Sequence, residues 1–483
     1  MKTDFSVRVK VWLLFFLFLF VVVTEARGDI QLADNFSVTG FLRHEFALHT
    51  GGKNPNNNQD DNNKINLSRS FFITEWTYLP SDMVKLYAKA RLLHDQTEQL
   101  DSDLNEFDAF PLSTPRYGTY LRANNDDDFA AELWELYGDL NVGNLLLRLG
   151  KQQIVWGEMI SSRILDIINP LEMSWHWTFE PEEYENIRVP QWSIRAVYNV
   201  EQMISIPWLN DVYLEGFLNP GDFVPTIMPE PGAPFNVIPA FPPFFNITET
   251  DRRGDLQYGF RLGYRIGQFF STLNYLHLYT QNSYLDTVGG GPPPNMVFMK
   301  QRYPATGIYG MSVNYAFPQP YNIVVTYEGT YFPRHPYYDA AASLPEIKKQ
   351  GTLKHAIRFD RKTFVFPRPT SAMTIQVQYS QSVVEGDEGK IAGSGSTEID
   401  KTVDTLVLNM SQMFRHDTIS VSNTVVYDLD GAYYIKPGFQ YLHGDDWYFD
   451  IYGIFLGGSE KRSGRLGSMS WADEVYARVT YQF

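Results

Sequence analysis

The chain ends in EVYARVTYQF, residues 474–483, and this segment predicts more about the fold than any other. Counting back from Phe483, every second residue is apolar: Tyr481, Val479, Ala477 and Val475. The residues between them are mostly polar, so the period is two, which predicts a β-strand with one apolar and one polar face. A strand that runs to an exposed terminal aromatic is typical of a transmembrane β-barrel, whose closing strand must cross the whole apolar layer. The alternative at this stage is an ordinary edge strand.

The segment also resembles the C-terminal signal of Gram-negative outer-membrane proteins, in which the insertion machinery recognises a final Phe. The resemblance implies that Tyr481 and Phe483 form a membrane-insertion signal and that the barrel-assembly machinery is a partner.

The N-terminal segment predicts export. Lys2, Arg8 and Lys10 precede an unbroken apolar run, Val11 to Val23, and small residues for cleavage follow up to Gly28. The run is shorter than the about 20 residues of a spanning helix. Residues 1–28 are therefore expected to be a secretory signal peptide, and residues 29–483 a single outer-membrane barrel domain.

Composition excludes several classes of protein. The chain has no cysteine, so it forms neither disulfides nor thiolate metal sites. Its formal net charge of −16 argues against nucleic-acid partners. Aromatic residues make up 15% of the chain, as expected for rings that form girdles at two membrane interfaces.

Alternation and turn signals divide the chain into about eighteen strands, with 16–18 as the range. Most are long enough to span, which takes about 9–11 tilted residues. The expected strands are 35–49, 65–79, 83–95, 130–141, 144–155, 190–201, 211–219, 256–267, 269–280, 307–317, 320–333, 354–366, 371–382, 402–414, 417–428, 432–443, 446–457 and 472–483. The phase of the second strand, which decides its lumen-facing residues, is ambiguous.

Connections between these strands alternate between short and long, with one exception at Asp428 to Gly431. Short turns such as Gly267-Gln268 are followed by long loops such as 281–306. This alternation belongs to barrels with short periplasmic turns and long external loops, and it requires an even number of strands. The predicted fold class is therefore all-β: a transmembrane antiparallel β-barrel that encloses an aqueous lumen.

The polar face of each strand should line the lumen and form a basic wall. Its basic members are Lys85, Lys89, Arg91, Arg148, Arg195, Arg261, Arg265, Arg358 and Arg478. Such a wall would favour anions. The alternative is that these residues pair with acidic loops folded inward.

The segment 150–190 contains three short motifs: Trp156-Gly157-Glu158, Asn169-Pro170-Leu171-Glu172 and Arg188-Val189-Pro190. Together they resemble a family of proteobacterial outer-membrane proteins classed only as a domain of unknown function. The resemblance implies a porin-like barrel, in some members encoded beside envelope lipid-trafficking and exporter components, and it brings no established substrate.

A loop at 156–189 should fold into the lumen and constrict it, because a strand entering Trp156-Gly157 must bend at the glycine. The candidate constriction residues are Glu158, Arg163, Asp166, Asn169 and Glu172. The alternative for each is that it only holds the loop against the wall. A second loop, 220–255, is rich in proline and apolar residues and is expected to pack into the barrel mouth as a lid, a plug or an entry site.

No motif for catalysis, a cofactor or a metal is present: the nine histidines lack metal-binding spacing, and no nucleophile elbow occurs. The sequence therefore predicts a non-enzymatic, porin-like channel in the outer membrane of a Gram-negative bacterium. Small solutes, anionic or hydrophobic ones among them, would pass passively. The alternative is a non-conducting component of a lipid-trafficking or export system, with a periplasmic or exporter partner. Outer-membrane lipid and lipopolysaccharide are expected neighbours, and the oligomeric state is left open.

Overall fold

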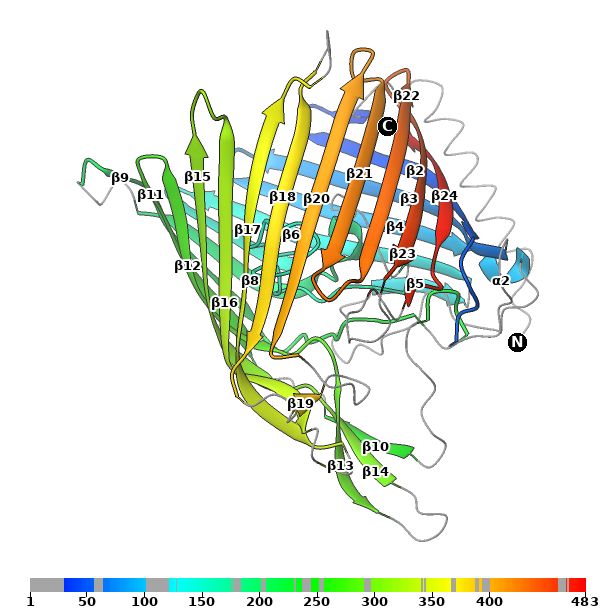
Figure 1. The fold of residues 1–483 in the computed structure, drawn as a ribbon. Coiled ribbons are helices and arrows are strands. Elements are labelled where there is room, and N and C mark those ends of the chain that lie inside the picture. Colours follow the sequence, from blue (N-terminus) through cyan, green and yellow to red (C-terminus); the bar gives the residue numbers. More distant parts are fainter. Residues whose placement is uncertain are drawn as a thin grey trace.

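The computed structural model is a closed antiparallel β-barrel of 18 strands (Figure 1). The structure describes the chain except for residues 1–29, 56–63, 101–120, 127, 175, 177–183, 201–205, 230–231, 237–244, 252–255, 291–296, 340–341, 343–344, 366–370, 387–390, 393–399, 459–465 and 467–468. The expected signal peptide lies outside the described residues. No described helix has the length and apolar character needed to cross a membrane.

Each of the expected strands is present, so the predicted fold class and strand number are confirmed. The barrel strands, in order around the wall, are β2 (Phe36–His49), β3 (Lys64–Ser81), β4 (Val84–Asp95), β6 (Phe129–Val142), β7 (Leu145–Gln152), β8 (Gln191–Asn199), β9 (Leu209–Asn219), β11 (Gln257–Ile266), β12 (Phe269–Tyr279), β15 (Ala305–Phe317), β16 (Ile323–Asp339), β17 (Ile347–Thr363), β18 (Met373–Val384), β20 (Thr402–Phe414), β21 (Ile419–Asp428), β22 (Tyr433–His443), β23 (Trp447–Gly457) and β24 (Glu474–Gln482).

The long connections carry additional short elements that the sequence analysis treated as loops. These are β1 (Ile30–Ala33), α2 (Thr97–Leu100), β5 (Leu121–Asp126), α3 (Tyr184–Ile187), β10 (Phe245–Asp251), β13 (Tyr284–Gly290), β14 (Val297–Arg302) and β19 (Ile391–Ala392). β10, β14 and β13 form a separate three-stranded sheet, in which β10 pairs in parallel with β14. In Figure 1 this sheet lies below the barrel, at the end that holds the long connections.

The barrel closes between β24 and β2, where Phe41 lies opposite Gln482 and His49 opposite Glu474. The alternation expected for the last strand is present: Val475 and Val479 are exposed on the outer face. Glu474 and Arg478, on the other face, are buried. The polar face of the closing strand therefore belongs to the interior of the barrel.

The terminal aromatic differs from the expectation, because Phe483 is buried, with 4% of its surface exposed. Its ring stacks on Phe72 at a centroid distance of 6.0 Å and packs against Val38. Its backbone N–H and C=O both bond to Gly40, at 3.0 and 2.9 Å. A Cβ on Gly40 would lie 2.2 Å from the Ile73 carbonyl oxygen, so this position requires glycine.

The inner face of the wall changes character along the strands. Near the short turns it is polar, and toward the long connections it becomes apolar. On β9, Tyr213 and Glu215 precede Phe217, and on β12, Asn274 precedes Leu276. The apolar positions pack against the loops, so a buried core fills part of the barrel at the long-loop end. This partial core differs from the aqueous lumen that the sequence predicted.

Candidate constriction segment and lumen wall

Residues 153–170, here called the crossing segment, run from the end of β7 to the opposite side of the barrel. β7 and β18 lie about halfway around the strand order from each other. Val377 is exposed on the outer face of β18, so the neighbouring, fully buried Gln378 points inward. Contacts between the crossing segment and such inward side chains therefore place it inside the barrel.

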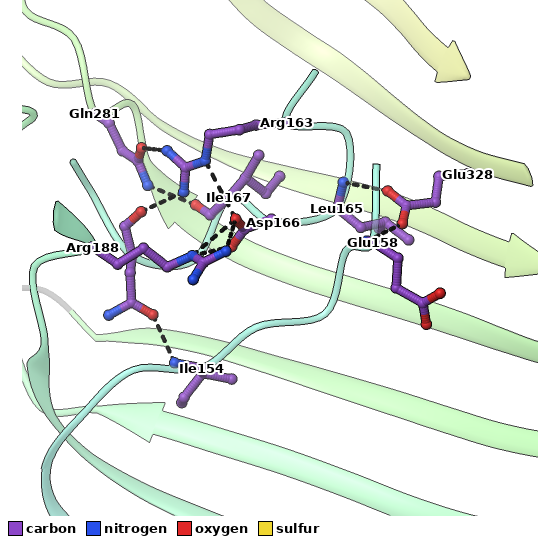
Figure 2. Close-up of polar contacts among 10 residues, drawn as sticks. Ile154, Glu158, Arg163, Leu165, Asp166, Ile167, Arg188, Gln281 and Glu328 are labelled. Carbon is purple, nitrogen blue, oxygen red and sulfur yellow. Dashed lines mark hydrogen bonds and ion pairs between the residues drawn. The ribbon is translucent and has the colours of Figure 1, made fainter. Parts of the chain in front are cut away.

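Three inward side chains of the far wall bind the backbone of the crossing segment, and one of them is Arg358 of β17, which donates to the Glu158 carbonyl. Glu328 of β16 accepts hydrogen bonds from the N–H groups of Glu158 and Leu165, the latter at 3.2 Å (Figure 2). Gln378 accepts from the Ile160 N–H at 2.8 Å and donates to the Ile160 carbonyl at 2.6 Å. These bonds satisfy backbone groups that would otherwise be buried without partners.

The bend at the start of the segment depends on Trp156 and Gly157. The Trp156 indole N–H donates to Glu215 on β9 at 2.9 Å. A Cβ on Gly157 would lie 2.4 Å from the Asp166 backbone nitrogen, so no other residue fits where the two halves of the segment touch. The bend at this glycine was expected from the sequence. The close contact with the Asp166 backbone arises because the crossing segment turns back on itself.

Arg163 and Asp166 belong to a group of ion-paired and hydrogen-bonded side chains with Arg188 and Gln281, here called the hub. Asp166 accepts from Arg188 at 2.9 and 2.8 Å and lies 3.7 Å from the Arg163 Nε. Arg163 also donates to the Asn169 carbonyl at 2.6 Å. It donates to Gln281 at 3.1 Å as well (Figure 2). Burial lowers the pKa of the Arg163 guanidinium, an effect that Asp166 opposes.

Asn169 and Glu172 are buried as well. The Asn169 side chain accepts from the Ile154 N–H and donates to the Val189 carbonyl, both at 2.8 Å, and so ties the two ends of the loop together. The Glu172 carboxylate lies 3.3 Å from the Arg91 guanidinium on β4. The contacts of Arg163, Asp166, Asn169 and Glu172 thus hold the loop in place.

Glu158 differs from these four residues. Its side chain is exposed and points away from the hub in Figure 2. Its carboxylate oxygens lie 3.5 Å from the amide nitrogen of Asn314 on β15. Glu158 is therefore the candidate constriction residue that presents a charge to open space, while a constricting role for all five residues stays a prediction.

Most basic residues of the predicted wall lie beside an acid of a neighbouring strand, but Arg358 lies beside Asp360 of its own strand, β17, and Lys85 lies beside a tyrosine. Lys89 lies 3.1 Å from Glu75, Arg148 2.6 Å from Asp139, Arg358 2.9 Å from Asp360, and Arg478 2.9 Å from Asp450. Arg91 pairs with Glu132, Arg265 with Asp211, and Arg195 with Glu215 at 2.7 Å. Arg261 lies 3.9 Å from the same Glu215, and the Lys85 ammonium lies over the Tyr87 ring at 5.7 Å.

The sequence pattern did not identify four of the acids that pair with these residues, Glu75, Glu132, Asp211 and Glu215, as inward-facing. The phase of β3 was ambiguous, and a β-bulge in β6 opposite Lys89 and Ala90 reverses the alternation near Glu132. The same bulge puts Trp134 inside, with the Arg91 guanidinium 3.3 Å from its ring centroid. A net positive wall stays a prediction.

A family model described as "Protein of unknown function (DUF1302)" matches residues 33–393. The chain belongs to this family. No curated protein sequence matches it.

Similar solved structures are porin barrels. A BenF-like porin from Pseudomonas fluorescens Pf-5 has a TM-score of 0.54 at 8% identity, covering 94% of this chain and 100% of the porin. Acinetobacter baumannii OccAB3 has a TM-score of 0.52 at 11% identity, with 94% and 100% coverage. Pseudomonas aeruginosa OccK3 (OpdO) has 0.50 at 10% identity, with 94% and 96% coverage. Identities this low show a shared fold, and that fold points to the outer membrane of a Gram-negative bacterium.

In this DUF1302 barrel, a second loop segment packs against the first. Val224 and Ile227 are buried with Trp134 and Val189. The Ile227 N–H donates to the Leu171 carbonyl at 2.9 Å, so the two loops are joined by backbone bonds. Residues 230–231, 237–244 and 252–255 of the expected lid, 220–255, lie outside the described residues.

The first loop also contacts the closing strand. His176 is hydrogen-bonded to Glu474, which is fully buried, and its ring lies 4.3 Å from that of Phe235 in the second loop. The two loops and the wall therefore form one packed layer at the long-loop end. Within the described part of this DUF1302 chain, no group of three or more His, Asp or Glu side chains could hold a metal ion.

Proposed function

We propose that this chain is an outer-membrane channel for the passive passage of small solutes, with the crossing segment as its constriction. The observation that carries the proposal is the binding of this segment by Glu328 and Gln378, which lie on the inner face of the opposite wall. The porin-type fold and the polar inner face near the short turns support the same function.

The solute class follows from two features. The ion-paired arginines along the inner wall favour small polar or anionic solutes that exchange hydrogen bonds with them. The apolar layer formed by the two loops favours hydrophobic solutes that enter through the mouth. The Glu158 carboxylate is the more direct guide to the class of solute, because it is exposed where the crossing segment faces the wall.

The test is ion selectivity in planar bilayers. Replacing Glu158 by Gln removes one negative charge at the constriction, so the reversal potential in a potassium chloride gradient should shift toward chloride. The matched control is Glu185→Gln, since Glu185 is an exposed glutamate of the same loop. An unchanged reversal potential in the Glu158→Gln channel would remove the crossing segment from the ion path.

The second candidate is a non-conducting component that docks with, or hands lipid to, a periplasmic or exporter partner. The packed apolar layer at the long-loop end favours it, because such a layer would hinder the passage of ions through the mouth. Cross-linking in cells that captures an envelope partner, together with absent conductance, would support this function. Robust conductance without any captured partner would reject it.

A further inference from the structure

The first loop is attached to the closing strand through one buried carboxylate. Glu474 lies on the inner face of β24 at the long-loop end, and none of its surface is exposed. One of its oxygens is hydrogen-bonded to the His176 Nε2, and the other accepts from the Asn66 amide of β3 at 3.4 Å. Within the part of the chain that the structure describes, no Lys or Arg forms an ion pair with Glu474, and Arg478 of the same strand pairs with Asp450 at 2.9 Å.

A second histidine near this carboxylate is neutral, as its hydrogen bonds indicate. The His49 Nε2 lies 2.6 Å from the Gly52 carbonyl oxygen, which only accepts, so this nitrogen carries a proton. The His49 Nδ1 lies 3.5 Å from the Asn66 amide nitrogen, which only donates, so Nδ1 carries none. Among the described residues, His176 is therefore the group in contact with Glu474 that can balance its negative charge.

The His176 imidazole lies between the second loop and the wall. Its ring centroid is 4.3 Å from that of Phe235 in the second loop and 6.1 Å from that of Tyr476 on β24. Its side chain is 12% exposed. A change in the contact between His176 and Glu474 therefore acts on both loops at once.

Other charged or titratable groups face this pair from the neighbouring strands. Glu45 of β2 faces the Tyr476 phenol and lies 3.8 Å from the Arg43 guanidinium. Asp473 accepts a hydrogen bond from a backbone N–H of β23 at 2.7 Å. Carboxyl and phenol groups ordinarily titrate well below and well above neutral pH, so the His176 imidazole is the member of this group whose charge changes between about pH 5 and pH 8.

We propose that His176 and Glu474 form a pH-dependent latch that holds the two loops against the closing strand. At acidic pH the imidazolium balances the buried carboxylate, and the latch is closed. As the pH rises and the imidazole loses its proton, the neutral ring can still donate one hydrogen bond, but the carboxylate keeps an unbalanced charge in a buried place, which is strongly unfavourable. Detachment of the loops hydrates this carboxylate, so the latch opens at alkaline pH. Its effect on conductance rests on the proposed channel function.

The test is single-channel recording and limited proteolysis of the folded protein at about pH 5.5 and about pH 8.5, on either side of the range in which histidine titrates. The parent protein should show larger or more frequent open levels at the higher pH. His176→Lys keeps its positive charge at both pH values and should stay latched, whereas His176→Gln should be unlatched at both. At the higher pH, protease should cut the two loops of the parent about tenfold faster or more than those of His176→Lys, a comparison in which the protease works under the same conditions.

The matched control is His416→Gln, because His416 is an exposed histidine of the short turn between β20 and β21. It should respond to pH as the parent does, and retained heat-modified mobility on gels shows that each variant is folded. A full pH response in His176→Gln would overturn the latch, as would equal cleavage of the parent and His176→Lys at the higher pH. Conductance that does not change with pH would reject the latch alone, and pH-dependent cleavage without conductance at either pH would reject the channel alone.

Discussion

Gln378 is the residue whose loss should most directly free the crossing segment. Its side chain bonds both polar groups of the Ile160 peptide, at 2.8 and 2.6 Å, and lies 3.2 Å from the Ser162 hydroxyl. Replacing it by alanine removes these bonds and leaves a buried N–H and C=O without partners. The two bonds of the segment to Glu328 and the bond of Arg358 to the Glu158 carbonyl remain, so the barrel itself should still fold.

The expected magnitude comes from these contacts. Each unsatisfied buried group costs about 1–3 kcal/mol, so the attached state of the segment should lose about 3 kcal/mol. That loss corresponds to a shift of about a hundredfold toward the detached state. If the segment constricts the pore, detachment should enlarge the conductance or add frequent transitions between levels.

The assay is single-channel recording in planar bilayers, with limited proteolysis of the crossing segment as a second readout. Gln440→Ala is the matched control, because Gln440 is a wall glutamine that bonds Asp450 and not the segment. Identical conductance levels, transition rates and cleavage in Gln378→Ala and the parent protein would show that Gln378 does not hold the segment in a constricting position.

Three further predictions follow from the packing. Arg91→Met leaves Glu132 and Glu172 buried without their shared cation, so the temperature of heat-induced unfolding on gels should fall. The expected loss of unfolding free energy is about 3–5 kcal/mol. Arg302→Met is the control, and equal unfolding temperatures of the Arg91→Met and parent proteins would contradict the prediction. Gly157→Ala should expose the crossing segment to protease because the new Cβ would meet the Asp166 backbone at 2.4 Å, whereas Gly289→Ala, with nothing within 4 Å, should not. Deleting Phe483 removes both bonds to Gly40 and the stack on Phe72, so less protein should reach the outer-membrane fraction; unchanged yield would show that the terminal residue does not guide closure.

Much of the fold is predictable from the sequence because its barrel strands alternate locally. The period of two around Val475 and Val479, and the short glycine turns such as Gly267 with a φ of 59°, are properties of neighbouring residues. Closure of the barrel then follows from the alternation of short and long connections.

The remaining features depend on contacts that local patterns do not contain. The parallel pairing of β10 with β14 joins two separate loops, and Glu328 binds the backbone of Glu158 from far along the chain. A single extra residue in β6 reverses the phase near Glu132, and an alternation count that ignores it assigns this acid to the wrong face.

The candidate constriction illustrates the same limit. The sequence identified the loop and its polar residues, but it gave Glu158 and Asn169 equal standing. The two residues have different environments in the structure. Asn169 is 1% exposed and is hydrogen-bonded to both ends of the loop, whereas Glu158 is exposed.

Single-channel recording of the purified, folded protein tests directly whether the barrel conducts small solutes past the crossing segment. We expect discrete conductance steps, which should grow when residues 220–250, among them Val224 and Ile227 of the apolar layer, are deleted. Absence of any conductance from the folded protein, both before and after this deletion, would contradict it.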